Sequence, residues 1–546
     1  MAKFLSIAVV VLFAVIAGFS LLHKGLPPTH DGEYHVVRFF LFDEALRDGN
    51  LYPRWSAHLN SGFGVPLFNF VYPLPNYLAS FLHLFSFSFI DSFKIIMFAA
   101  TIIGAIFFYL WTKEFWGRLG GIVSSVFYTF SPYHFADIYI RGSIGEVLAL
   151  AFFPAFLWSY TKFALSKQRL FFILSSLFLA LIIFSHNILA LMFFFFSLSY
   201  ITLLIYKEKN KKYLMLNTFY LILLGLGLSA IFWLPAIFET KFAAGLQIFD
   251  IGAHFPDLYQ LLIPSWGSGF SGAGLQNALS FQIGLANLFV IFLSLVVAVW
   301  QVIKRDKKSI YTIFFLIWFI LTFYLMLSIS LPIWNTVPLM NYFQFPWRLL
   351  SLEILFASFL AGSIFSLKIK NKSVKIALAI FLVFAVFTLG VGYARPAYYL
   401  LRDDNYYTSR SNFIDGTNSP GNVFNTIFLK NIPSKEKERI VILKGDAKIS
   451  SRETKSNLYN FSVNSKNNSE ILMNVAYYPG WNVYVNNVKT NVEVKNGRFS
   501  FLVPAGEGQV RVVFEETPIR IVADLISVLS LIALSALFIQ YKSSKI

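Results

Sequence analysis

The chain has 546 residues, of which 57% are hydrophobic, 18% aromatic and only 13% charged. Because a soluble domain carries about a quarter charged residues, this composition excludes an ordinary soluble protein, and it is too apolar for a disordered chain. The absence of cysteine excludes disulfides, thiolate catalysis and thiolate metal sites.

Apolar runs of membrane-spanning length recur along the whole chain. A helix needs about 20 residues to cross a hydrocarbon layer about 30 Å thick. The first run is too long for a signal peptide and lacks a small-residue cleavage site. We therefore predict a polytopic α-helical membrane protein with about 12 transmembrane helices. The predicted spans are residues 4–22, 92–112, 119–131, 144–161, 170–185, 188–206, 213–232, 283–303, 309–330, 349–367, 374–392 and 519–540.

Lysine and arginine gather in every second loop between these spans. This alternation follows the positive-inside rule and predicts a cell (plasma) membrane protein with both termini in the cytoplasm. It also explains much of the formal net charge of +17, with anionic lipid headgroups as partners. Since the basic residues form no single face, we expect no nucleic-acid partner. The basic clusters are Lys113/Arg118, Lys162/Lys167/Arg169, Lys207/Lys209/Lys211/Lys212, Lys304/Arg305/Lys307/Lys308, Lys368/Lys370/Lys372/Lys375 and Lys542/Lys545.

The predicted boundaries divide the chain into three parts. Residues 1–392 form a multi-helix transmembrane domain whose long first outer loop spans residues 23–89. In that loop Pro73 and Pro75 interrupt an apolar segment, residues 68–89, which we predict to be re-entrant or interfacial. An extracytoplasmic, mainly β domain at 393–518 and a C-terminal anchor with a cytoplasmic tail at 519–546 complete the chain.

The β domain is predicted from alternating apolar residues separated by turn signals. Asn496-Gly497 between two such segments favours a tight hairpin. We expect a small antiparallel β-sandwich. Its predicted strands are residues 439–443, 458–464, 470–477, 481–485, 492–494, 498–503 and 509–514.

Polar side chains gather directly after the first predicted span, as His30, Asp31, Glu33 and His35. Asp31 and His35 are four residues apart and share one face if a helix begins there. An amphipathic stretch, residues 36–46, follows and could lie along the membrane surface. The alternative is that Asp31 only caps this helix.

Further polar residues are expected at the same outer level of the membrane. Ionisable groups at membrane depth are costly and tend to face a cavity, although each of these residues could instead be an interfacial anchor or part of a local ion pair. The sequence contains no phosphate-binding glycine loop, nucleophile elbow or His-Glu-x-x-His motif, so we expect no nucleotide cofactor. The candidates are Arg54, Trp55, His134, Asp137, Arg141, Glu146, His186 and Arg348, with Glu353 one turn deeper.

These motifs resemble a family of bacterial and archaeal membrane proteins, the 6-pyruvoyl-tetrahydropterin synthase-related family. The many helices, the long first outer loop and the acidic residue after the first span also resemble GT-C-type membrane glycosyltransferases. The Tyr477–Trp481 hairpin and the Val503–Gly506 turn resemble the outer domain of YfhO-like proteins, which are implicated in glycosylating cell-surface polymers. We expect no pterin, because the soluble synthase uses a catalytic cysteine. The motifs are His30-Asp31-x-x-Tyr34-His35, Asp48-Gly49-x-Leu51-Tyr52-Pro53-Arg54-Trp55, Asn60-Ser61-Gly62-Phe63-Gly64, Tyr72-Pro73-Leu74-Pro75, Ser131-Pro132-Tyr133 and Asp137-Ile138-Tyr139-Ile140-Arg141-Gly142-x-x-x-Glu146.

The GT-C resemblance implies an inverting sugar transfer from a polyprenyl-phosphate-linked donor to an extracytoplasmic acceptor glycan or lipid. In that scheme Asp31 is the general base and Glu33 orients the acceptor. Arg54, Arg141 and Arg348 would stabilise the leaving phosphate. The other substrate-binding candidates are His30, His35, Trp55, His134, Glu146 and His186. If a divalent cation such as Mg²⁺ or Mn²⁺ takes part, its ligands would be Asp31, Glu33 and Glu146.

Two other classes of function fit the same sequence. A lipid or glycan transporter (a flippase) would need polar residues through the membrane midplane, where Glu353 is the only clear acidic candidate. A non-catalytic scaffold for envelope assembly would use the β domain to hold partners. The position of Asp31 separates these classes, because an enzyme needs Asp31 at a cavity, whereas a scaffold needs it only as a cap.

Overall fold

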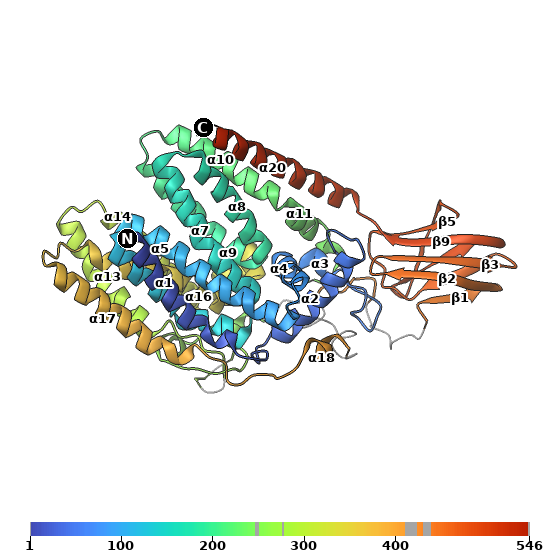
Figure 1. Cartoon of the computed structure of the whole chain (residues 1–546), viewed down its shortest axis with the longest axis horizontal. Coiled ribbons are helices and arrows are strands. Elements are labelled where there is room, and N and C mark those ends of the chain that lie inside the picture. Colours follow the sequence, from blue (N-terminus) through green and yellow to red (C-terminus); the bar gives the residue numbers. More distant parts are fainter. Residues whose placement is uncertain are drawn as a thin grey trace.

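The first part of the chain forms a bundle of helices, and the C-terminal part adds a β-sandwich beyond one end of that bundle (Figure 1). The computed structural model describes residues 2–245, 250–272, 274–275, 278–409, 423–429 and 438–543. Both termini lie at the end of the bundle away from the sandwich, because the last helix runs back along the bundle (Figure 1). We call the opposite end, where the first helix finishes, the distal end.

Eight helical segments of the described residues are long and apolar enough to cross a membrane. Two further pairs of helices reach this length only together, and they are bent by 74° and 88°. The predicted polytopic helical membrane fold is therefore confirmed. The eight segments contain α1 (Ala2–Gly18), α5 (Phe89–Thr129), α7 (Ile144–Ser166), α9 (Asn187–Lys207), α13 (Leu285–Ile303), α16 (Leu350–Ser363), α17 (Lys372–Gly390) and α20 (Pro518–Ser543). The bent pairs are α10 (Lys211–Leu228) with α11 (Ala230–Phe238), and α14 (Ser309–Leu325) with α15 (Leu331–Thr336).

Helix α5 is a hairpin of two antiparallel segments. Gly117, at φ 73° and ψ −174°, interrupts it in the left-handed region that favours glycine. The two halves then pack on each other: the Ser125 hydroxyl donates to the Ala105 carbonyl at 2.7 Å, and the Tyr128 and Phe108 rings stack with centroids 4.3 Å apart. These halves correspond to the predicted spans 92–112 and 119–131. Together with the shorter apolar helix α8 (Arg169–Ser185), they reconcile the structure with the predicted number of spans.

The first outer loop forms a packed layer at the distal end. Helix α2 (Gly32–Arg47) contains the predicted amphipathic stretch, and the proline-interrupted segment forms the short helices α3 (Leu67–Phe70) and α4 (Leu74–Leu84). The ring of Phe42 lies 5.1 Å from that of Phe68 and 4.8 Å from that of Tyr77. The loop is therefore a folded part of the protein.

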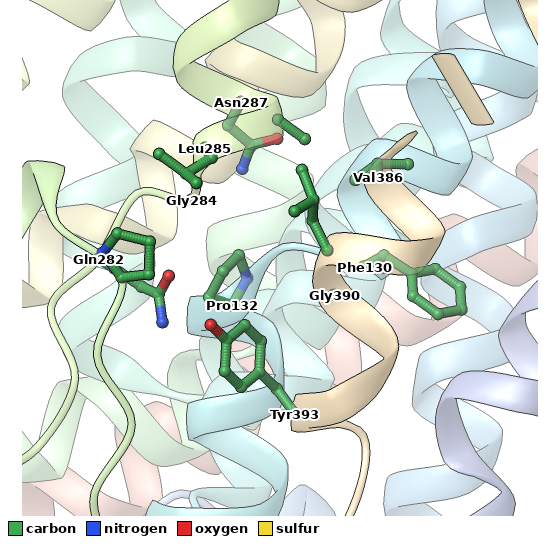
Figure 2. A pocket seen from close by; sticks show the side chains of 12 residues that line it. Phe130, Pro132, Gln282, Gly284, Leu285, Asn287, Val386, Gly390 and Tyr393 are labelled. Atoms are coloured by element: carbon green, nitrogen blue, oxygen red, sulfur yellow. The ribbon is translucent and has the colours of Figure 1, made fainter. Parts of the chain in front are cut away.

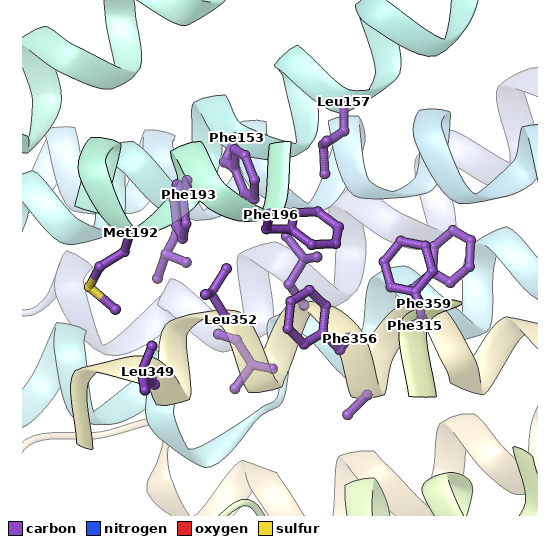
Figure 3. Packing of buried hydrophobic residues seen from close by; sticks show 14 of the residues in the cluster. Phe153, Leu157, Met192, Phe193, Phe196, Phe315, Leu349, Leu352, Phe356 and Phe359 are labelled. Carbon is purple, nitrogen blue, oxygen red and sulfur yellow. The ribbon is translucent and has the colours of Figure 1, made fainter. Parts of the chain in front are cut away.

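An aromatic core fixes the helices that begin at the distal end (Figure 3). Phe153 of α7 stacks on Phe193 of α9, with ring centroids 3.9 Å apart. Phe315 of α14 stacks on Phe359 of α16 at 3.8 Å. Because helices in lipid associate through packing rather than through the hydrophobic effect, these contacts determine where α7, α9 and α16 present their distal polar groups.

The C-terminal part is an antiparallel β-sandwich, as predicted. Its sheets have the strand orders β1-β4-β8-β7 and β2-β3-β9-β5-β6. The Asn496-Gly497 turn joins β7 to β8. The sequence prediction missed β2 and β6, which are the edges of the five-stranded sheet and lack a clear apolar alternation. The strands are β1 (Ile440–Lys444), β2 (Ala447–Lys455), β3 (Leu458–Ser465), β4 (Ser469–Met473), β5 (Trp481–Val485), β6 (Val488–Thr490), β7 (Glu493–Lys495), β8 (Arg498–Val503) and β9 (Gly506–Phe514).

The first outer loop inserts an aromatic side chain into this sandwich. The Trp55 ring lies 5.5 Å from the Trp481 ring and 5.4 Å from the Phe514 ring, and Trp55 is almost fully buried. Tyr478 is buried in the same core. Trp55 therefore anchors the sandwich to the bundle.

An ion-pair network with buried arginines lies beside this anchor. Arg520 at the start of α20 pairs with Glu239 at 2.9 Å, and Arg54 pairs with Glu516 at 2.9 Å. The Asn69 side chain joins the two pairs, because it accepts from Arg54 at 3.3 Å and donates to Glu239 at 2.9 Å. We call this network the collar; it consists of Arg54, Asn69, Glu239, Glu516, Arg520 and Asp524.

We expect the collar to stabilise the junction of the sandwich with the bundle. Arg520 is 0% exposed, so Arg520→Ala leaves Glu239 as a buried charge that has lost its main partner. The expected loss is about 3–5 kcal/mol of stability. Thermal unfolding of the purified protein measures it, with Arg511→Ala on an exposed strand position as the control, expected within about 0.5 kcal/mol of wild type. Equal melting temperatures for the two variants would contradict a stabilising role for the collar.

Candidate functional site

Main-chain contacts hold the residues after α1 against the segment before α7. The amide of His30 donates to the Ile140 carbonyl, and the amide of Asp31 donates to the Arg141 carbonyl, each at 2.9 Å. Gly142 has φ 64°, and a Cβ there would lie 2.2 Å from Thr29 Oγ1. Only glycine permits this approach, so the backbone itself keeps Asp31 next to Arg141.

Glu146, in the first turn of α7, binds two arginines. Arg141 Nη1 and Nη2 donate to its two carboxylate oxygens, each at 2.6 Å. Arg348 Nε lies 2.9 Å from Glu146 Oε1, and Tyr133 donates its hydroxyl to Oε2 at 3.3 Å. Arg348 lies in the short helix η7 (Pro346–Leu349) that leads into α16. The carboxylate thus joins α7 to α16 at the distal end.

Arg141 has a second acidic partner. It belongs to η2 (Ala136–Arg141) and pairs with Asp137 of the same element. The Trp347 ring also lies against its guanidinium, with the ring centroid 4.9 Å from Cζ. These charged groups are almost entirely buried, and such groups need partners and hydrogen bonds to remain ionised. We call Asp31, Asp137, Arg141, Glu146 and Arg348 the distal cluster.

Asp31 occupies the N-cap position of α2, but its side chain makes no capping hydrogen bond. Thr29 Oγ1 instead accepts from the Gly32 amide at 3.1 Å. Residue Asp31 as a whole is partly exposed. Burial raises its pKa above the usual aspartate range, and the positive charges of Arg141 and Arg38 act in the opposite direction. The interpretation of Asp31 as only a cap is therefore not supported.

Arg38 is a residue that the sequence prediction missed. It falls in the amphipathic stretch and looks like an ordinary solvent-facing cation there. It lies seven residues after Asp31, hence two turns further along the same helix face. The seven-residue spacing from Asp31 is the feature of the sequence that could have identified Arg38 as a neighbour of Asp31. Its charge acts on Asp31 and on Tyr72.

Two of the predicted histidines, His186 and His134, are buried. His186 lies near the distal cluster in space, and His134 lies close to Asp137 in the sequence. His186 Nε2 lies 3.9 Å from Glu146 Oε1, and burial lowers the pKa of His186 to about 3. His134 donates from Nδ1 to the Tyr128 carbonyl at 3.3 Å, and burial lowers its pKa to about 4. Both rings are therefore neutral at physiological pH.

The two histidines that flank Asp31 in the sequence differ from each other. His30 donates from Nε2 to the Ser268 carbonyl at 2.8 Å and stacks on the Phe270 ring at 5.0 Å. This contact brings the segment between α12 (Leu258–Leu262) and α13 next to Asp31. His35 is buried and stacks on Phe93 at 6.1 Å, and burial lowers its pKa well below its usual value.

The predicted metal ligands do not converge. Glu33 forms a salt bridge with Arg402 at 2.8 Å, and Glu146 is occupied by its two arginines. Among the residues that the structure describes, no group of three or more histidine, aspartate or glutamate side chains could hold a metal ion. The residues present do not fit a divalent cation, so we derive no step through one.

Three further predicted residues lie away from the distal cluster. Arg54 is paired within the collar, where Asp524 also lies 3.2 Å from its guanidinium, and Trp55 packs in the sandwich. Glu353 is fully buried in α16 and accepts from the Thr322 hydroxyl. The structure thus brings together Asp31, Arg141, Glu146, His186 and Arg348, and it separates Arg54 and Trp55 from them.

The model of the 6-pyruvoyl-tetrahydropterin synthase related domain, described as a membrane protein, matches residues 68–394. An uncharacterized protein of Lactococcus lactis subsp. cremoris (strain MG1363) is 25% identical over 246 residues, which are 43% of this chain and 39% of that protein. The chain therefore spans well under half of that relative's length.

Among solved structures, the Archaeoglobus fulgidus oligosaccharyltransferase tethered with an acceptor peptide containing the NVT sequon aligns with a TM-score of 0.41 and 14% identity. That alignment covers 74% of this chain and 57% of the oligosaccharyltransferase chain. The same protein in complex with Zn and sulfate gives 0.41 and 13%, over 74% of this chain and 54% of that chain.

The family match includes Asp137, Arg141, Glu146 and Arg348, and it extends over more than half of the 546 residues. The chain accordingly belongs to the 6-pyruvoyl-tetrahydropterin synthase-related family of membrane proteins, as its motifs predicted.

Proposed function

We propose that this protein is a membrane glycosyltransferase that moves a sugar from a polyprenyl-phosphate-linked donor to an acceptor glycan or lipid, with inversion at the anomeric carbon. One observation carries the proposal. Asp31, a partly exposed residue whose side chain has no capping role, is held by the main chain beside Arg141, and Glu146 holds Arg141 together with Arg348. A base and cationic groups for a leaving phosphate are thus adjacent.

The proposed reaction takes place on the extracytoplasmic side of the cell membrane, with both termini in the cytoplasm. The basic clusters in every second loop support this orientation. The position of the two termini at the end of the bundle away from the sandwich also supports it (Figure 1). The proposal keeps the boundaries predicted from the sequence: a transmembrane domain at 1–392, an outer domain at 393–518 and an anchor at 519–546.

Asp31 acts as the general base. It takes the proton from the acceptor hydroxyl while that oxygen attacks the anomeric carbon of the donor sugar. The bond between the anomeric carbon and the phosphate oxygen breaks, and polyprenyl phosphate leaves with the bonding electrons. A positioned base contributes about 10²–10⁴-fold to the rate and works best when its pKa is close to the operating pH. The raised pKa of Asp31 is a shift in that direction.

Arg141 and Arg348 stabilise the negative charge that develops on the leaving phosphate, because guanidinium groups bind phosphate oxygens with charge-assisted hydrogen bonds. Glu146 is a positioning residue that fixes both guanidiniums. Arg54 has no part in this mechanism, since two collar carboxylates already neutralise it. Asp31 lines neither the pocket beside Pro132 and Tyr393 nor the one beside Glu114 and Tyr311. The proposal therefore rests on the charged neighbours and partial exposure of Asp31 and not on a cavity.

We expect Asp31→Asn to abolish transfer, with a rate loss of about 10²–10⁴-fold. Cells that lack the protein are complemented with wild type, Asp31→Asn or Asp91→Asn, and their surface glycans are profiled by mass spectrometry. Asp91 is a matched control, because it is a carboxylate at the same end of the bundle that pairs with Lys94 at 3.0 Å. A wild-type profile from folded Asp31→Asn protein would exclude Asp31 as the base.

The pH dependence of the rate should report the ionisation of Asp31. The base works only when deprotonated, so the rate falls as the pH drops through the pKa of Asp31. Because burial raises that pKa, the acidic limb should lie above the pH range of an exposed aspartate. The measurement is polyprenyl phosphate release in proteoliposomes that contain lipid extract from the producing cells. An acidic limb that persists unchanged in the residual activity of Asp31→Asn would assign it to another group.

A further inference from the structure

A pocket with a volume of about 230 Å³ lies among the described residues. It lies at the distal end between the start of α13 and the end of α17 (Figure 2). Figure 2 shows Gly390 and Tyr393 at the end of α17 across the pocket from Leu285 and Asn287 of α13, with Pro132 between them. The walls are mainly apolar, and Gln282, Asn287 and Tyr393 supply the polar side chains.

The helices on either side of the pocket face the bilayer. Leu285 of α13 is 47% exposed and Leu389 of α17 is 49% exposed, and both line the pocket. Both helices are candidate membrane spans. An exposed leucine on a spanning helix contacts hydrocarbon, so the pocket opens where lipid chains are the neighbouring molecules.

One side of the pocket carries the residues of a membrane interface. The Tyr393 ring stacks on the Trp266 ring with centroids 4.6 Å apart, and such aromatic pairs gather at the level of the lipid headgroups. Arg395, two residues beyond Tyr393, is exposed. A cation at this level attracts a phosphate group.

We propose that this pocket binds one acyl chain of an anionic phospholipid from the adjacent leaflet, with its phosphate near Arg395 and the Tyr393 hydroxyl. The site is separate from the distal cluster, and its occupancy does not depend on the proposed sugar transfer. A chain that moves from bilayer hydrocarbon into the pocket gains close packing against the apolar walls, which disordered lipid does not offer.

The bound chain would support the short helix of Pro132 and Tyr133, which contacts the distal cluster. Pro132 lines the pocket, and its neighbour Tyr133 donates to Glu146. Asn287, also in the lining, donates from Nδ2 to the Ser131 hydroxyl at 2.9 Å. The lipid would therefore pack against α6 (Pro132–Phe135), the helix whose Tyr133 contacts Glu146.

Photolabelling tests the proposal. The protein is reconstituted in vesicles of phosphatidylethanolamine and phosphatidylglycerol, with a diazirine in one acyl chain of a fraction of the phosphatidylglycerol, and adducts are mapped by mass spectrometry. We expect labelling at Leu389 to exceed that at Leu295, which is 44% exposed on α13 and lies outside the pocket. Leu285→Trp fills the pocket and should reduce labelling at Leu389 several-fold, because the larger ring takes the space of the chain. Leu295→Trp is the matched control and should leave it unchanged.

A second variant keeps the test independent of pocket repacking. Arg395→Gln alters an exposed side chain and should reduce labelling at Leu389 by phosphatidylglycerol, whereas Arg511→Gln on the sandwich should not. Equal labelling of Leu389 and Leu295, or equal effects of the two tryptophan variants, would overturn the proposal. Loss of the label on addition of polyprenyl phosphate, but not of excess phosphatidylglycerol, would also overturn it and assign the pocket to a polyprenyl chain.

Discussion

The burial of Glu146 between two arginines is the interaction on which the distal end of the bundle depends. A carboxylate removed from water is costly unless oppositely charged and hydrogen-bonding groups surround it. Glu146 meets this requirement with Arg141, Arg348 and the Tyr133 hydroxyl. Those partners come from three different elements, so the pairing fixes α6, η2 and η7 around the first turn of α7. Once Arg141 is fixed, its carbonyl positions the amide of Asp31.

The collar fixes the outer domain to the bundle in a similar way. Its Arg54, however, is fully paired inside the protein. Arg54 contacts both Glu516 and Asp524, so its charge is fully used inside the protein. Trp55, the next residue, fills the sandwich core. One short segment of the first outer loop therefore anchors the sandwich through an ion pair and an aromatic contact. The distal cluster and the collar both hold buried arginines and partly exposed carboxylates, but Glu516 and Asp524 of the collar are paired with Arg54, whereas no ion pair holds Asp31 among the described residues.

The membrane spans were predictable from the sequence because lipid imposes a simple rule: the backbone must be helical and the side chains apolar over about 20 residues. The short run 119–131 could be understood only with Gly117, whose conformation reverses the chain. The edge strands β2 and β6 escaped prediction since exposure on an edge removes the apolar alternation.

Site residues were predictable by type and by level in the membrane, but not by partner. Arg54 and Arg141 look alike in the sequence, as arginines that follow or precede apolar segments. The acidic partners of Arg141 lie four and five residues away, whereas Glu516 lies 462 residues from Arg54. No local pattern reveals the distant partner. The same holds for Glu33, one of the three ligands named for a cation if one takes part, because it pairs with Arg402 in a segment more than three hundred residues away.

The two arginines of the distal cluster are unequal, and the difference bears on the proposed mechanism. Arg141 donates to two carboxylates, those of Asp137 and Glu146, so most of its charge is compensated. Arg348 shares Glu146, but its Nη1 donates to neutral acceptors, the Phe343 carbonyl and the Gln344 side chain. A neutral acceptor leaves the positive charge largely uncompensated, and an arriving phosphate gains more from such a group. Within the proposed reaction, Arg348 is therefore the stronger phosphate ligand, and Arg141 mainly holds Asp31 and Glu146 in register.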